Sequence, residues 1–199
     1  SCWALFVTSS AKINLPTTSI LEVSSTETLP QIYARVNNNK IFNNLSDSSR
    51  LCRYVSTISI NVTSVGTLII EGCTLEMNST SNDGQYDLII VGQLIANYSN
   101  ITRSISHNYE FILDRSSNSQ ILNSFISFTG ATTVNGRRGL VLKTNNITFD
   151  NNTLYRAYSS NVELFANRIE LKNSRFLGGA LTEYNLFVLS NDSKIINSD

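Results

Sequence analysis

The stretch Leu140-Val-Leu-Lys-Thr-Asn-Asn-Ile-Thr-Phe-Asp-Asn-Asn-Thr-Leu154 is repeated 22 residues later as Val162-Glu-Leu-Phe-Ala-Asn-Arg-Ile-Glu-Leu-Lys-Asn-Ser-Arg-Phe176. Apolar residues and asparagines match at a constant offset over the whole length of the two stretches. At an offset of 24, the second stretch matches a third that contains Leu186, Ile195 and Asn197. Self-similarity at a fixed period of this size indicates a repeat architecture.

Looser copies precede these three, and the six copies have their first apolar positions at residues 68, 94, 119, 147, 169 and 193. Each copy contains two or three short segments with alternating apolar residues, which is the pattern of β-strands. Because one copy cannot bury its apolar face alone, the copies must stack on each other. The spacing therefore predicts a parallel β-helix in which each copy is one coil.

A bend residue recurs two positions after an inward-facing apolar residue in five of the copies. The bend between two sheets favours a residue that tolerates the left-handed backbone conformation, which Asn and Gly do best. Stacked asparagines can also hydrogen-bond to each other along the axis. The sequence thus predicts a ladder of bend residues at Gly72, Asn123, Asn151, Asn173 and Asn197.

From Gly66 to Asp199 the chain resembles the right-handed parallel β-helix repeat proteins of the pectin-lyase-like class, most closely in the phrase between Asn145 and Leu154. The resemblance implies an all-β solenoid, here of about six coils, of a kind found on cell surfaces, in phage spikes and in secreted carbohydrate enzymes. It implies little about function. A two-sheet sandwich is the alternative fold; it accounts for the strands but not for the constant offsets.

Residues 1–65 lack the repeat. Pro16 and Pro30 interrupt them, and residues 19–25 and 31–36 alternate like strands. We expect an N-terminal strand or arm at residues 1–15, a β-rich cap at 16–57 that covers the open end of the solenoid, and the parallel β-helix at 58–199.

The composition is polar, but amide and hydroxyl side chains outnumber the charged ones. Among 199 residues there are 25 Asn, 28 Ser and 18 Thr, whereas Lys plus Arg and Asp plus Glu number 15 each, so the net charge is zero. This balance argues against a nucleic-acid partner. No apolar run is long enough for a membrane span. A single histidine, His107, makes a histidine-based metal site improbable.

Several features favour an extracellular or cell-surface location. The three cysteines lack metal-site or redox spacing, and Cys52–Cys73 is the favoured disulfide because Cys2 lies close to the beginning of the chain. Sequons for N-glycosylation are about as frequent as chance predicts for this composition. The glycosylation candidates are Asn44, Asn61, Asn78, Asn97, Asn100, Asn146, Asn151 and Asn191.

Nothing in the sequence identifies a catalytic centre, a metal site or a cofactor. Carbohydrate-active enzymes with this fold place carboxylates together on one sheet. We find no acidic residue that recurs in the same register on adjacent coils, and the family's hydrolase signatures are missing. Tyr98, Tyr155 and Tyr158, with Arg156, could form a strip on which sugars stack, although packing of turns explains them more simply.

We therefore expect a non-catalytic structural subunit of a filament or adhesive fibre, plausibly glycosylated. The last copy stops within a coil, which predicts an apolar end covered either by a longer chain or by a second copy joined head-to-tail. The neighbour's Trp3-Ala4-Leu5-Phe6-Val7 could add a strand to that end. The alternatives are a polysaccharide lyase or hydrolase fragment and a carbohydrate-binding spike. The low charge resembles that of archaeal surface proteins.

Overall fold

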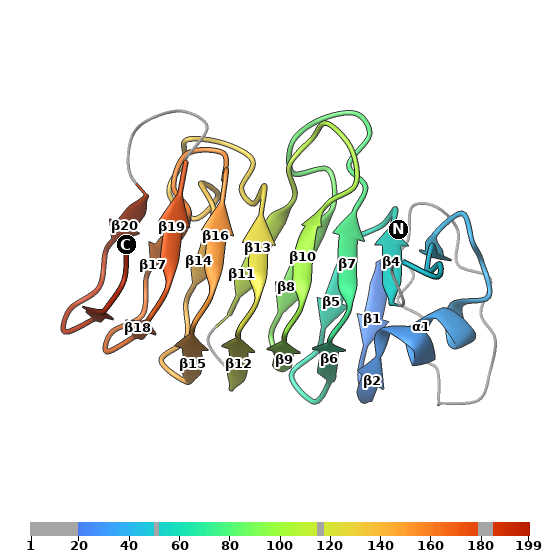
Figure 1. The fold of residues 1–199 in the computed structure, drawn as a ribbon, viewed down its shortest axis with the longest axis horizontal. Coiled ribbons are helices and arrows are strands. Elements are labelled where there is room, and N and C mark those ends of the chain that lie inside the picture. Colours follow the sequence, from blue (N-terminus) through green and yellow to red (C-terminus); the bar gives the residue numbers. More distant parts are fainter. Residues whose placement is uncertain (1–19, 50–51, 115–117, 179–184) are drawn as a thin grey trace.

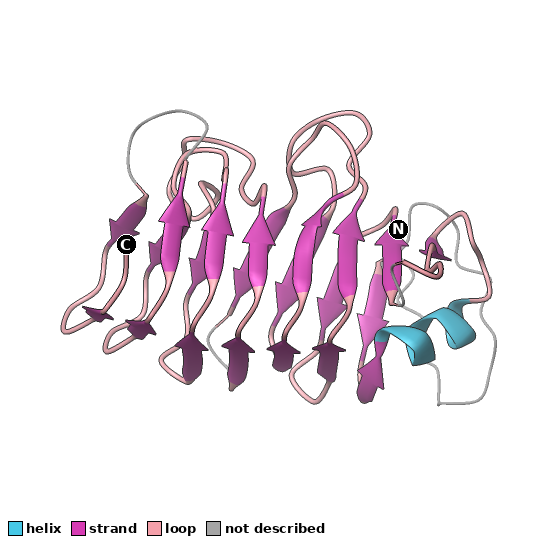
Figure 2. Ribbon diagram, viewed as in Figure 1, coloured by secondary structure: helices cyan, strands magenta, loops and turns pink. Residues whose placement is uncertain are grey.

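The computed structural model describes residues 20–49, 52–114, 118–178 and 185–199 of the chain. The fold is mostly β and contains one short helix among these residues (Figure 2). Three seven-stranded sheets lie along the length of the molecule, and the chain passes through them in order, one strand at a time (Figure 1). The predicted parallel β-solenoid is therefore confirmed.

We call the sheets A, B and C in the order in which the chain enters them. Sheet A contains β1 (Leu21–Val23), β5 (Ile60–Val62), β8 (Asp87–Ile90), β11 (Glu110–Leu113), β14 (Leu140–Leu142), β17 (Val162–Leu164) and β20 (Leu186–Val188). Sheet B contains β2 (Thr26–Thr28), β6 (Thr67–Glu71), β9 (Gln93–Asn97), β12 (Ser119–Leu122), β15 (Ile147–Asp150), β18 (Glu170–Lys172) and β21 (Lys194–Ile196). Sheet C contains β3 (Phe42–Asn44), β4 (Arg53–Ser56), β7 (Thr74–Met77), β10 (Asn100–Arg103), β13 (Phe125–Ser127), β16 (Thr153–Tyr155) and β19 (Arg175–Leu177).

The strands pair in the register that the repeat predicts. Leu140 lies beside Val162, and Val162 lies beside Leu186. In sheet B the offsets of 22 and 24 place Phe149, Leu171 and Ile195 in one column. All pairings except β3 with β4 are parallel. The constant offsets thus reflect coils that stack residue on residue.

Five turns are complete, from β5–β7 to β17–β19, rather than the expected number of about six. The six copies in the sequence correspond to β6, β9, β12, β15, β18 and β21 of sheet B. The last of these, β21, is not followed by a strand of sheet C among the described residues. The inward-facing apolar side chains of all three sheets form one continuous buried core.

The N-terminal region differs from the expected β-rich cap. Residues 31–36, which alternate like a strand, belong to helix α1 (Leu29–Val36). Thr28 and Gln31 form a capping box at its start, and Leu29, Ile32 and Val36 follow a helical spacing that buries all three. The helix lies against the end of the stack and closes the core there (Figure 2).

The solenoid also begins earlier than residue 58. Strands β1 and β2 extend sheets A and B by one rung, because they pair in parallel with β5 and β6. A long insertion containing α1 and β3 separates β2 from β4, which hides this first rung from a search for repeats of constant length.

The predicted disulfide is present. Cys52 precedes β4 and Cys73 precedes β7, and because these strands are neighbours in sheet C the two Cα atoms lie 4.7 Å apart. The bond thus joins the first two rungs of sheet C.

Candidate functional site

The candidate site is a shallow groove along the bend between sheets B and C. Its first part encloses about 410 Å³ and crosses the rungs of β7, β10, β13 and β16. A second hollow of about 310 Å³ continues along the same bend toward β21. The two share Asn151 and Thr153, so together they follow the axis of the solenoid. We call this feature the B–C groove.

One side of the B–C groove is formed by the bend residues. All six have positive φ, between 48° and 61°. The sequence predicts five of them, and the sixth is Tyr98, which aligns with the others in the repeat but is an aromatic residue. The six are Gly72, Tyr98, Asn123, Asn151, Asn173 and Asn197.

The amides of the bend residues form a ladder that is interrupted once. Asn151 donates from Nδ2 to Asn123 Oδ1 over 2.8 Å, and Asn197 donates to Asn173 over 3.4 Å. Between these pairs, Asn173 donates to Asp150 Oδ1 at 2.7 Å instead of to Asn151. An amide group has two N–H donors and two acceptor positions, so each bend asparagine keeps hydrogen-bonding capacity beyond these contacts.

A second ladder, which the sequence analysis missed, lies beneath the groove. At four bends the next residue is a buried or half-buried Ser or Asn whose side chain accepts a hydrogen bond from the backbone N–H of its counterpart one rung earlier. Along the axis these side chains belong to Ser124, Asn152, Ser174 and Ser198, with N···O distances of 2.9 to 3.2 Å. The recurrence of Ser or Asn directly after the bend residue is the signal that could have revealed it.

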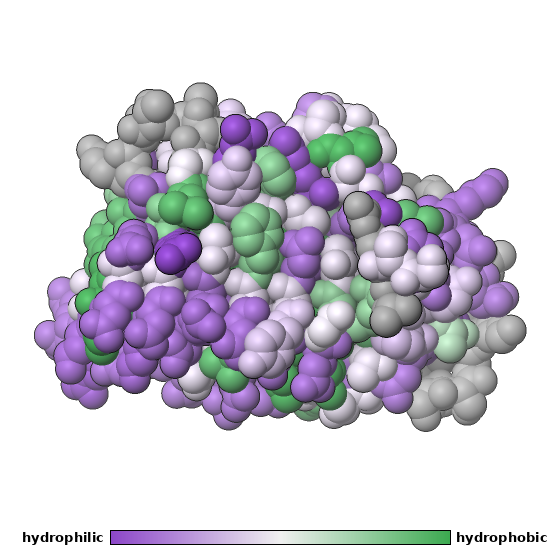
Figure 3. All heavy atoms as spheres, viewed as in Figure 1, coloured by the Kyte–Doolittle hydropathy of each residue, from purple (hydrophilic) through white to green (hydrophobic). Residues whose placement is uncertain are grey.

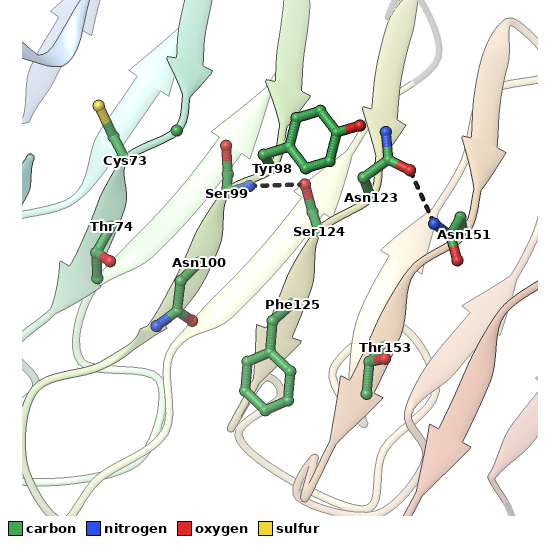
Figure 4. A pocket seen from close by; sticks show the side chains of 11 residues that line it. Cys73, Thr74, Tyr98, Ser99, Asn100, Asn123, Ser124, Phe125, Asn151 and Thr153 are labelled. Atoms are coloured by element: carbon green, nitrogen blue, oxygen red, sulfur yellow. Dashed lines mark hydrogen bonds between the residues drawn. The ribbon is translucent and has the colours of Figure 1, made fainter.

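The other side of the groove is the first outward-facing column of sheet C. Figure 4 shows Thr74, Asn100, Phe125 and Thr153 in a row that faces Tyr98, Asn123 and Asn151. The side chain of Tyr98 is 71% exposed and that of Phe125 is 38% exposed. These two rings are the apolar surfaces of an otherwise polar groove.

An aromatic cluster borders the groove on the outer face of sheet C. The ring of Tyr155 lies 6.1 Å from that of Phe125 and 6.0 Å from that of Phe128. The guanidinium of Arg103 lies over Phe128 at 3.9 Å, and that of Arg156 lies 5.2 Å from Tyr155. The predicted strip of Tyr98, Tyr155 and Arg156 is thus on this side of the molecule, although Tyr98 stands at the bend and Tyr155 in the sheet. Tyr158 follows β16 in the loop that leads to sheet A.

Charge is distributed unevenly along the groove. None of the 11 residues that line its first part is charged. Arg175 and Asp199 border the second hollow, where Arg175 Nε lies 3.9 Å from Asp199 Oδ2. Figure 3, which presents this face, shows a hydrophilic band interrupted by apolar patches.

Two carboxylates do recur in register, contrary to the sequence analysis. Asp87 in β8 and Glu110 in β11 are neighbours in sheet A, near the bend between sheets C and A. Burial raises the pKa of Asp87 to about 6, the Glu110 carboxylate adds to the rise, and Arg137 opposes it. The repeat does not reveal this pair, because Glu110 belongs to a sheet A strand preceded by a loop of variable length.

The pair of Asp87 and Glu110 has a structural role, because it helps to hold a loop in place. Arg137 donates from Nε to Glu110 Oε1, and the side chain of Glu110 is largely buried. One residue further along the same loop, the backbone N–H of Arg138 donates to Glu163 Oε2 over 3.1 Å. Glu163 is fully buried, and this burial raises the pKa of its carboxyl group. Both contacts hold the loop before β14 against sheet A.

Some of the residues that the sequence analysis named fall outside the part of the chain that the structure describes. Trp3 to Val7 and Cys2 lie outside the described residues. Within the described part of the chain, no three His, Cys, Asp or Glu side chains are grouped so that they could hold a metal ion. The helix found there lacks the length and apolar character required to cross a membrane.

Comparisons of the chain with models of protein families, with curated proteins and with solved structures found no match. The structure by itself places the protein in the class of parallel β-solenoids, with three sheets, about five turns and one disulfide among the described residues.

Proposed function

We propose that the protein is a non-catalytic extracellular β-solenoid that binds a neutral carbohydrate chain in the B–C groove. The observation that carries this proposal is the continuity of the groove across consecutive rungs, from Gly72 to Asn197. Because a groove that follows the solenoid axis contacts successive units of a ligand in the same way, it suits an extended polymer better than a compact small molecule.

The lining of the groove has the chemistry that sugars require. Hydroxyl and amide groups that can donate and accept are repeated on each rung, which suits the hydroxyl groups of a pyranose. The rings of Tyr98 and Phe125 supply apolar surface for the C–H faces of a sugar. The absence of charged residues from the first part of the groove favours a neutral ligand over a uronic acid polymer.

Two further features support an extracellular, non-catalytic role. The Cys52–Cys73 disulfide suits an oxidising environment. The carboxylate pair of Asp87 and Glu110 is held by Arg137 at the bend between sheets C and A, whereas the groove follows the bend between sheets B and C. The finer likeness to right-handed parallel β-helix proteins of the pectin-lyase-like class is consistent with a surface or spike protein, and on this fold function follows from the site.

The test is binding of the purified protein to neutral glucans, mannans, xylans and galactans, with an acidic polygalacturonan beside them, measured by affinity electrophoresis and calorimetry. We expect at least one neutral polymer to bind. Tyr98→Asn should weaken that binding about fivefold, because loss of one stacking ring corresponds to roughly 1 kcal/mol. Asn is the residue that most other rungs have at this bend, so the backbone conformation is kept.

Tyr158→Ala is the matched control, because it removes a partly exposed tyrosine outside the groove and should leave binding unchanged. Equal loss in both variants, or binding to the acidic polymer alone, would contradict the proposal. Release of new sugar ends during the incubation would instead support the alternative of a carbohydrate-active enzyme.

A second candidate function is that of a structural subunit of a filament, extended at the β20 and β21 edge. There the inward-facing side chains of Val188 and Ile195 are 45% and 50% exposed, whereas Leu164 and Leu171, one rung earlier, are fully buried. Helix α1 covers the opposite end, so two open edges do not simply meet head-to-tail. We propose that the edge accepts the segment Trp3–Val7 of a neighbouring copy.

Sedimentation of the full chain and of a variant lacking residues 1–10 tests this second function. The full chain should form concentration-dependent polymers, and the shortened chain should remain a folded monomer with the same circular dichroism spectrum. A full chain that sediments as a monomer at every concentration would exclude assembly by this route.

A further inference from the structure

Three of the eight sequons differ from the others in their surroundings. Asn44, Asn146 and Asn191 are exposed and lie outside the B–C groove, whereas Asn151, the fourth exposed sequon asparagine, lines the groove. The Oδ1 atom of Asn44 accepts from the backbone N–H of Ser46 over 2.9 Å, in an Asx turn that uses the oxygen of the amide and leaves its nitrogen to the solvent. Asn146 and Asn191 lie in the bends between sheets A and B, directly before β15 and shortly before β21.

Three of the other five sequons lie at or beside the B–C groove, which Asn100 and Asn151 line. Asn97 accepts from Asn123 over 2.9 Å, and Asn151 donates from Nδ2 to Asn123. The Oδ1 atom of Asn100 is buried. A glycan on any of these nitrogens would enter the stack of amides and fill the groove.

The last two sequons are also enclosed. Asn61 is half-buried within sheet A, where Glu22 and Ile89 are its neighbours on the two adjacent strands. Asn78 follows β7 directly, and its Oδ1 atom is buried. A branched sugar attached at either position would have to displace the adjacent chain.

We infer that Asn44, Asn146 and Asn191 are the N-glycan acceptors of the folded protein and that the other five sequons remain unmodified. In this reaction a lipid-linked oligosaccharide diphosphate is the donor. The bond between its sugar C1 and the diphosphate oxygen breaks, a bond from C1 to the asparagine Nδ2 forms, Nδ2 loses one proton, and the lipid diphosphate leaves. The sugars then cover the cap and the A–B bends and leave the B–C groove open.

The inference rests on the extracellular location in the proposed function and is independent of whether the groove binds carbohydrate. It is tested by secreting the full chain from a eukaryotic host that modifies Asn-X-Ser/Thr sequons and mapping glycopeptides of the folded, disulfide-bonded product by mass spectrometry. We expect glycans at three positions, and enzymatic removal should convert these three asparagines to aspartates.

Single variants assign each glycan. Asn44→Asp keeps the oxygen of the Asx turn and removes the acceptor, and Asn191→Asp removes the acceptor in the bend before β21. Thr148→Ala destroys the sequon of Asn146 at an exposed side chain, whereas Thr148→Ser preserves it and is the matched control. Each of the first three should lose the mass of one glycan, and Thr148→Ser should lose none.

Occupancy of Asn97, Asn100 or Asn151 in folded protein would overturn the inference, as would an unmodified Asn44, Asn146 or Asn191. Neither result depends on carbohydrate binding, so failure here is distinguishable from failure of the proposed groove. A fully occupied Asn61 or Asn78 would likewise show that enclosure in the folded state does not govern modification.

Discussion

Replacement of Gly92 by alanine should destabilise the protein by about 4 kcal/mol or more, placing it among the most damaging single substitutions in a chain of this size. Gly92 lies between β8 and β9, at a bend where its backbone packs closely against that of the preceding rung. A Cβ atom at this position would lie 2.1 Å from the carbonyl oxygen of Thr63 and 2.3 Å from that of Gly66. Both oxygens belong to backbone held between strands of sheets A and B, so neither can move away without breaking the ladder.

Gly72→Ala is the control for this prediction. Gly72 has a φ of 61°, but no heavy atom lies within 4 Å of the position that its Cβ would occupy. The cost is then limited to the left-handed conformation, about 1 kcal/mol. Urea unfolding followed by circular dichroism, with the disulfide intact, measures both variants. A similar loss in both would show that close backbone approach does not limit the stacking of rungs.

Asn152→Ala should destabilise the protein by about 3 kcal/mol, because it removes two buried hydrogen bonds to the backbone of neighbouring rungs. The Asn152 side chain is almost fully buried. Its Oδ1 accepts from the N–H of Ser124 over 2.9 Å, and its Nδ2 donates to the carbonyl of Ile121 over 2.7 Å. The smaller alanine would also leave a void between two rungs.

The neighbouring residue provides the comparison. Asn151→Gly removes an exposed amide of the outer ladder and keeps the left-handed bend, so its expected cost is at most about 1 kcal/mol. The two variants differ by one position in the chain and are measured by the same urea titration. If Asn151→Gly were the more damaging, the outer amides rather than the buried ladder would be the main support of the bend.

The sequence predicts the stacking of coils well because one physical requirement recurs on every rung. An inward apolar residue followed two positions later by a bend residue must return after each circuit, so the offset between Asn151 and Asn173 gives the observed register directly. The disulfide follows from the same stacking, since Cys52 and Cys73 precede neighbouring strands.

The structural features that the sequence did not predict are those that do not recur on every rung. The apolar residues of α1 are compatible with alternation over a few positions, and the capping box of Thr28 and Gln31 was the stronger signal. Tyr98 adopts a backbone conformation that aromatic residues rarely have, because stacked neighbours fix the bend. The Asp87–Glu110 pair could not be aligned because loops of different length precede the strands of sheet A.

The order in which the strands pair also bears on how the chain reaches its folded state. Except at the two ends of the sheets, each strand of the solenoid is paired with strands from the coil just before and the coil just after it in the chain. Each new coil therefore needs only its predecessor as a template, and the end covered by α1 can serve as a seed from which ordering proceeds along the axis. Such a molecule is expected to fold sequentially, coil by coil. A coil that does not fold would prevent the coils after it from folding.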